Sequence, residues 1–162
     1  MMDETNRQEL IRDFRQHVNT LYHSVREWLD SPNLSAKAGS VHLNEEAVGR
    51  YEVPLLSILA HGRQIAELRP VGLSIVGARG RVDLVGTFDS IPLLYLLQGG
   101  GAITSTVSAG EKVLDRSSRP LFHGVQRSGW YWIEDKKVGV ARLLDRSLFQ
   151  EVLARVSDYE WR

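Results

Sequence analysis

An α+β fold is predicted for this chain of 162 residues, with a long N-terminal helix and a C-terminal helix packed on one face of a twisted, mainly antiparallel sheet of five to seven strands. Three observations predict it. The chain begins with an apolar stripe of helical period, continues with short apolar segments whose connections are too short for crossover helices, and ends with a second helical stripe. A partly closed β-barrel is the alternative architecture.

The composition indicates one domain over residues 1–162, with 43% hydrophobic and 25% charged residues. Twenty basic side chains balance twenty acidic ones, so no net field attracts polyanions or acidic membranes. The absence of cysteine excludes disulfides, thiolate metal sites and cysteine nucleophiles. The start of the chain is polar, and the longest apolar run is too short to span a bilayer, so we expect a cytoplasmic protein without membrane contact. No cofactor is predicted.

Residues 1–30 are predicted to form the first helix. Apolar residues recur at steps of three and four, at Ile11, Phe14, Val18, Leu21, Val25 and Trp28. Asp3 or Thr5 is the expected N-cap, and the residues around Pro32 end the helix. The stripe is wide, which favours packing within the domain, and a homo-oligomer formed through this helix is the alternative. Residues 34–49 are predicted to be a polar connection.

Residues 50–98 are predicted to form a β-meander. Apolar and β-branched residues flank His61-Gly62-Arg63, which is typical of a hairpin with a short loop. Pro54 suits an edge strand or a bulge. Pro70 and Gly72 mark a further break before the next strands.

The last third of the chain is predicted to contain three segments. Three glycines and many small hydroxyl residues indicate a flexible loop over 99–120. Residues 121–144 are expected to form a β-hairpin that turns at the charged segment 134–137. The final helix covers 145–158, with Asp145 as its N-cap.

The glycine-containing segment 74–86 is the first candidate site. Gly77 and Gly80 fit neither a dinucleotide fingerprint nor a P-loop. Residues 75–82 resemble the Gly-x-x-Gly loop of KH domains, a resemblance that implies nucleic-acid binding. The alternation of apolar residues on both sides favours a hairpin tip instead. Arg79 and Arg81 would then be exposed cations suited to binding a partner.

A metal-dependent nuclease is the alternative function. Glu134 and Lys136 match the end of a nuclease pattern, and Asp83 and Asp115 are upstream carboxylates. However, Glu134 and Lys136 lie in an expected turn, where charged residues need no catalytic explanation. The five histidines form no metal-binding pair, and the serines lack a nucleophile elbow. We therefore predict no catalytic and no metal site.

The aromatic run Trp130-Tyr131-Trp132 is the second candidate site. Alternation along a strand sends one face into the core, and we expect the other to be exposed beside the loop 99–120. Exposed tryptophan and tyrosine are common at protein interfaces. The predicted function is therefore a small non-catalytic protein-binding module, such as an immunity or antitoxin partner or an accessory subunit of a larger bacterial complex. Another protein is the expected partner, and nucleic acid is disfavoured by the neutral net charge.

Overall fold

The computed structural model describes residues 3–109 and 112–161, with residues 102–120 described through the backbone alone. Its elements are α1 (Glu4–Trp28), β1 (Leu34–Glu45), β2 (Gly49–Ala60), β3 (Arg63–Gly72), β4 (Gly80–Gly86), β5 (Ser90–Leu96), β6 (Ala102–Ala109), β7 (Lys112–Pro120), β8 (Gly129–Asp135), β9 (Val140–Leu143) and α2 (Arg146–Ser157). Seven strands form one antiparallel sheet in the order β1-β2-β3-β4-β5-β8-β9, while β6 and β7 pair separately. The predicted α+β fold is confirmed, and the sheet is open, not a barrel.

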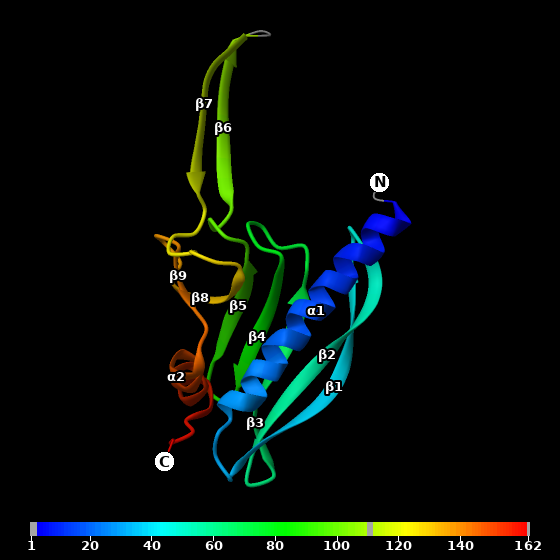
Figure 1. Cartoon of the computed structure of the whole chain (residues 1–162), viewed down its shortest axis with the longest axis vertical. Helices are drawn as coiled ribbons and strands as arrows, with labels where there is room; N and C mark the ends of the chain where they lie inside the picture. Colours follow the sequence, from blue (N-terminus) through cyan, green and yellow to red (C-terminus); the bar gives the residue numbers. More distant parts are fainter. Residues whose placement is uncertain (1–2, 110–111, 162) are drawn as a thin grey trace.

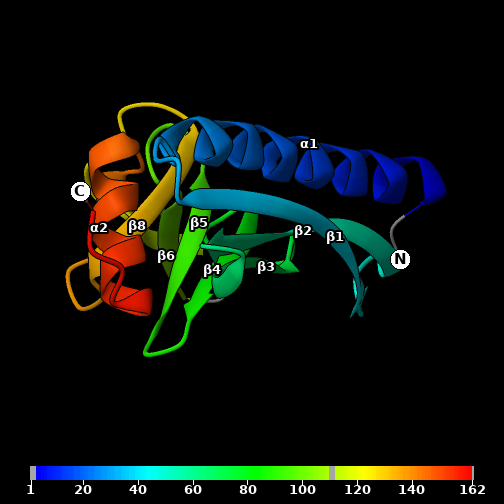
Figure 2. The ribbon, with the colours of Figure 1, turned by 90° about the horizontal axis from the view of Figure 1, so that it is seen from below.

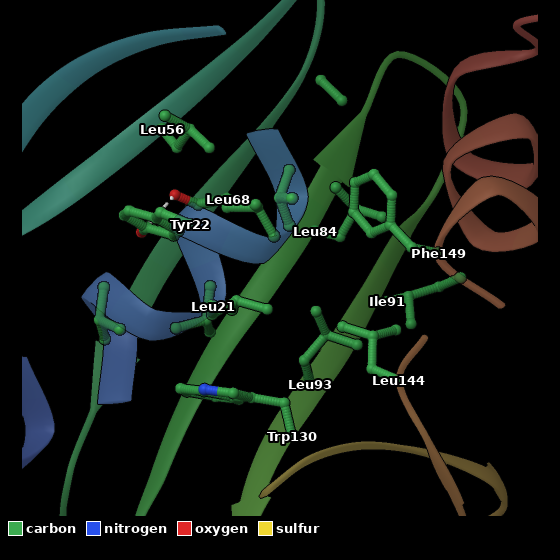
Figure 3. Close-up of a cluster of buried hydrophobic side chains, with 14 of the residues drawn as sticks. Leu21, Tyr22, Leu56, Leu68, Leu84, Ile91, Leu93, Trp130, Leu144 and Phe149 are labelled. Carbon is green, nitrogen blue, oxygen red and sulfur yellow. Dashed lines mark hydrogen bonds between the residues drawn. The ribbon is translucent and has the colours of Figure 1, made fainter. Parts of the chain in front are cut away.

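Both helices cover the same face of the sheet (Figures 1 and 2), where they bury their apolar stripes. The predicted caps are confirmed, because Asp3 accepts a hydrogen bond from the Asn6 backbone N–H at 2.9 Å and Asp145 accepts one from Leu148 at 2.8 Å. Figure 3 shows part of the main core, in which side chains of α1, α2 and the central strands meet. The stripe of α1 is thus buried within its own domain, so it is not available as a coiled-coil seam.

A second, smaller core lies on the opposite face of β5, β8 and β9. Its buried members are Leu96, Val125, Tyr131, Ile133 and Ala141. Strand β8 is therefore covered on both sides, with Trp130 and Trp132 in the main core and Tyr131 in the second. The expectation of an exposed aromatic face is wrong, because the segment after the β6–β7 ribbon contributes Phe122 and Val125 as a cover that helices alone would not provide.

Residues 34–45 form a long strand, not the predicted polar connection. This strand, β1, pairs with β2 over its whole length without a register shift. The buried positions of β2 change from odd to even between Val53 and Leu56, and those of β1 change in the same region. A strand pair that twists strongly presents opposite faces to the core at its two ends. Because of this change of phase, and because many of its residues are small or polar, β1 shows no regular alternation of apolar and polar residues along its length.

The predicted flexible loop over 99–120 contains the β6–β7 ribbon, which projects from the body of the molecule (Figure 1). Residues 110 and 111 lie outside the described residues. The base of the ribbon is closed by the backbone, since Leu121 donates a hydrogen bond to the Gly101 carbonyl at 3.2 Å and Phe122 donates one to Gly100 at 3.2 Å. The expectation of a loop is therefore wrong. It was based on small and polar residues, but the backbone pairing of a hairpin does not require large side chains.

Residues 73–79 connect the antiparallel strands β3 and β4, so the predicted turn between strands is confirmed. The predicted pairing of Ile75 and Val82 on neighbouring strands is wrong, because Val82 pairs with Pro70 of β3. The tip is a tight turn in which the Ala78 N–H donates to the Ile75 carbonyl and Gly77 has a φ of 77°, the value that a type II turn needs at this position. Gly80 begins a strand and not a helix, so the KH-like interpretation is wrong.

Candidate functional site

A groove lies between the N-terminal half of α1 and the loop that joins β3 to β4. Its cavity volume is about 510 Å³. The helix supplies one wall and the loop supplies the other, and Leu97, which follows β5, also lines the groove. The lining residues are Leu10, Asp13, Phe14, His17, Leu73, Ser74, Ile75, Val76, Ala78, Arg79 and Leu97.

The helical wall follows from the spacing of its residues. Leu10, Asp13, Phe14 and His17 lie three, four and seven positions apart, so they share one face of α1. Phe14 points into the main core and supplies the apolar floor. Asp13 and His17 place a carboxylate and an imidazole beside it.

The loop wall is held by a carboxylate at the end of β1. Glu45 accepts hydrogen bonds from the backbone N–H groups of Leu73 and Ser74, at 3.1 and 3.0 Å, and from the Tyr51 hydroxyl. Burial and this carboxylate raise the pKa of Tyr51 above its usual value, so the hydroxyl stays protonated and remains a donor. Because two successive backbone N–H groups of the loop bond to one carboxylate, Glu45 holds this wall of the groove in place.

His17 is the most constrained titratable group in the groove. Its ring stacks on Tyr95, with centroids 3.7 Å apart and planes 11° apart. Partial burial lowers the pKa of His17, while Asp13 raises it and Arg79 lowers it. The imidazole is therefore neutral at pH 7, when it can both donate and accept a hydrogen bond.

Arg79 combines with exposed apolar side chains at the rim. No described carboxylate lies within ion-pair distance of Arg79. Val76 is 86% exposed and Leu97 is 41% exposed. A second hollow of about 280 Å³, lined by Gly77, Ala78, Arg79, Leu97 and Gly101, continues from the groove to the base of the β6–β7 ribbon. The surface thus offers one cation within an apolar patch.

The two arginines predicted to bind a partner lie in different environments in the structure. Arg79 is exposed on the loop, as expected, and lines the groove. Arg81 is not at the tip. It lies on β4, where its guanidinium binds both carboxylate oxygens of Asp83, with Nε–Oδ1 at 2.7 Å and Nη2–Oδ2 at 3.1 Å. This bidentate pair satisfies Arg81 within the chain.

The three aromatic candidates lie in the core rather than at this groove. Trp130, Tyr131 and Trp132 are 6%, 1% and 7% exposed. Trp130 still touches the site indirectly, because its indole N–H donates to the backbone carbonyl of His17 at 2.9 Å and its ring lies edge-on to Tyr95. These residues support the groove, and the exposure on which their predicted binding role depended is absent.

The residues of the nuclease pattern are not assembled into one site. Glu134 pairs with Arg142 at 3.5 Å, Lys136 lies in the turn after β8, and Asp83 is held by Arg81. The side chain of Asp115 lies outside the described residues. Among the side chains that the structure describes, no group of three His, Asp or Glu residues could hold a metal ion.

Sequence reasoning missed His17 and Asp13 as site residues. Asp13 directly precedes Phe14 and His17 follows it by three positions, which marks both only as neighbours of the buried stripe. What makes them a site is the loop 73–79, which lies opposite them in space but about sixty positions away in sequence. That proximity depends on how β1 and Glu45 hold the loop, and β1 itself was not predicted.

Comparison of the chain with protein-family models, curated proteins and solved structures finds no match. Within the described residues, neither helix has the length and apolar character needed to cross a membrane.

Proposed function

We propose that this protein is a non-catalytic protein-binding module that holds an extended segment of a partner protein in the groove between α1 and the loop 73–79. The observation that carries this proposal is the exposed apolar rim of Val76 and Leu97 around Arg79, a cation with no described carboxylate partner. Exposed apolar surface beside a groove is typical of interaction sites.

The side chains of the groove define the segment it would bind. An apolar side chain of the partner would cover Val76 and Leu97, and a carboxylate next to it would pair with Arg79. Neutral His17 would add a hydrogen bond. Asp13 opposes a polyanion, and the chain has no net positive charge, so nucleic acid is a poorer ligand. The proposed setting is the cytoplasm, as an accessory subunit or an immunity-type partner of a bacterial protein.

Selection from a displayed library of random peptides tests this proposal. The immobilised protein should enrich peptides that carry an acidic residue beside a large apolar one. Arg79→Glu and Val76→Asp should each weaken binding of a selected peptide by about tenfold or more. Arg79→Glu removes the cation that pairs with the acidic residue of the peptide, and Val76→Asp places a charge in the apolar rim.

Val138→Asp is the matched control, since Val138 is also exposed but lies in the β8–β9 turn, away from the groove. It should bind the selected peptide as the unchanged protein does. Enrichment of no acidic-apolar motif, or equal binding by the groove variants and the control, would overturn the proposal.

A further inference from the structure

We infer that a second copy of this chain pairs with the outer edge of β1, antiparallel and centred on Ala38, so that the two sheets continue into one another. Strand β1 is the end strand of the sheet, and its far edge has no neighbouring strand among the described residues (Figure 1). This inference is independent of the groove.

The direction of each backbone group of β1 follows from two contacts. Pro54 has no N–H, so its pairing with Ser40 is one in which the two residues exchange no hydrogen bonds. The Asn33 carbonyl accepts from the His61 N–H at 2.9 Å, so odd-numbered residues bond to β2. The N–H and C=O groups of even-numbered residues, Ala36, Ala38 and Ser40, therefore point outward.

This edge lacks the features that keep sheet edges apart. Residues 36–40 are Ala, Lys, Ala, Gly and Ser, and all but the half-buried Ala36 are exposed. The pairing of β1 with β2 has no register shift, and β1 contains no proline. By contrast, β9 at the other edge is four residues long and is bridged by His123. Proteins commonly block a free edge with charges, proline, bulges or short strands, and along residues 36–40 only Lys37 and the guanidinium of Arg26, which donates to the Ala36 carbonyl, do so.

A second copy fits this edge by symmetry. When β1 pairs antiparallel with itself about Ala38, each outward residue faces another outward residue, Ala36 opposite Ser40 of the second copy. Lys37 then faces Gly39 of the second copy, so the only long side chain has space and no like charge opposes it. The side chain of Arg26, 3.5 Å from the Ala36 carbonyl, is exposed and has to move aside.

Amide hydrogen exchange and mass measurement on the full chain test this inference together. At rising concentration the mass should shift from monomer to dimer, and the amides of Ala36, Ala38 and Ser40 should become protected. The amides of Lys37 and Gly39, which bond to β2, should be protected at every concentration. This odd–even contrast distinguishes edge pairing from association elsewhere.

The matched variants are Ala38→Lys and Ala47→Lys, which place the same charge at two exposed alanines. Ala38→Lys places two lysines, one from each copy, opposite each other at the centre of the interface and should weaken dimerisation about fivefold or more. Ala47→Lys should leave dimerisation unchanged. A chain that stays monomeric at all attainable concentrations overturns the inference. So does a dimer in which the Ala38 amide still exchanges freely, or in which the two variants behave alike.

Discussion

The free energy of unfolding should depend on pH through His17, because the surroundings of this side chain shift its pKa. The pKa of this side chain lies below its usual value of 6.5, chiefly because partial burial disfavours the charged imidazolium. In the unfolded chain the same group titrates near its usual pKa. The unfolded state therefore binds more protons between the two pKa values, so the free energy of unfolding falls as the pH drops through about 6.5.

The corresponding prediction concerns His17→Gln, which removes this titration. Between about pH 7.5 and about pH 5.5, the variant should lose less stability than the unchanged protein, as measured by urea unfolding at each pH. Asn19→Gln, on the exposed side of the same helix, changes no titrating group, so it is the control and should keep the original pH dependence. If His17→Gln and the unchanged protein show the same slope against pH, His17 does not titrate as its environment indicates.

At the scale of elements, the packing of α2 on β4 depends on one glycine. A Cβ atom at Gly86 would lie 2.1 Å from the backbone oxygen of Val156, so β4 and the last turn of α2 approach each other without a side chain between them. Phe88 strengthens this contact by donating its backbone N–H to the same oxygen at 2.9 Å.

Gly86→Ala should therefore push α2 away from the sheet and cost about 1–3 kcal/mol of the free energy of unfolding. Gly39→Ala is the comparison, because a Cβ there would meet only Leu55 at an ordinary 3.5 Å. Its effect should stay within about 0.5 kcal/mol. Chemical denaturation of both variants measures the difference, and equal costs would show that α2 can shift without loss.

The elements that sequence reasoning predicted are those whose signal is local. The stripe and caps of α1 and α2 and the turn at His61-Gly62 are each defined within a few residues. Strand β1 was missed because its buried positions change phase, and the β6–β7 ribbon was missed because most of its residues are small or polar. The exposed face of Trp130–Trp132 was expected because two helices cover only one side of a sheet. The second core depends on Phe122 and Val125, which no local pattern connects to β8.

For the whole molecule, the β6–β7 ribbon is predicted to be dispensable for folding. Strands β6 and β7 pair with each other in a sheet of their own that projects from the body (Figure 1), and the flanking residues Gly101 and Leu121 are joined by a backbone hydrogen bond. Replacing residues 102–120 by a two-residue Asn-Gly turn should therefore leave the circular dichroism spectrum of the body intact and lower the melting temperature by only a few degrees. A variant that fails to fold would show that the ribbon supports the sheet.

The order of the elements, with α1 before the strands, has a consequence for synthesis on the ribosome. The apolar stripe of α1 is completed at Trp28, yet the strands that cover it continue to β8, whose Trp130 donates to the His17 carbonyl. At about 5–20 residues per second, several seconds of translation separate the two. During this interval the nascent helix has no sheet to dock on, so its apolar stripe stays exposed and open to a chaperone.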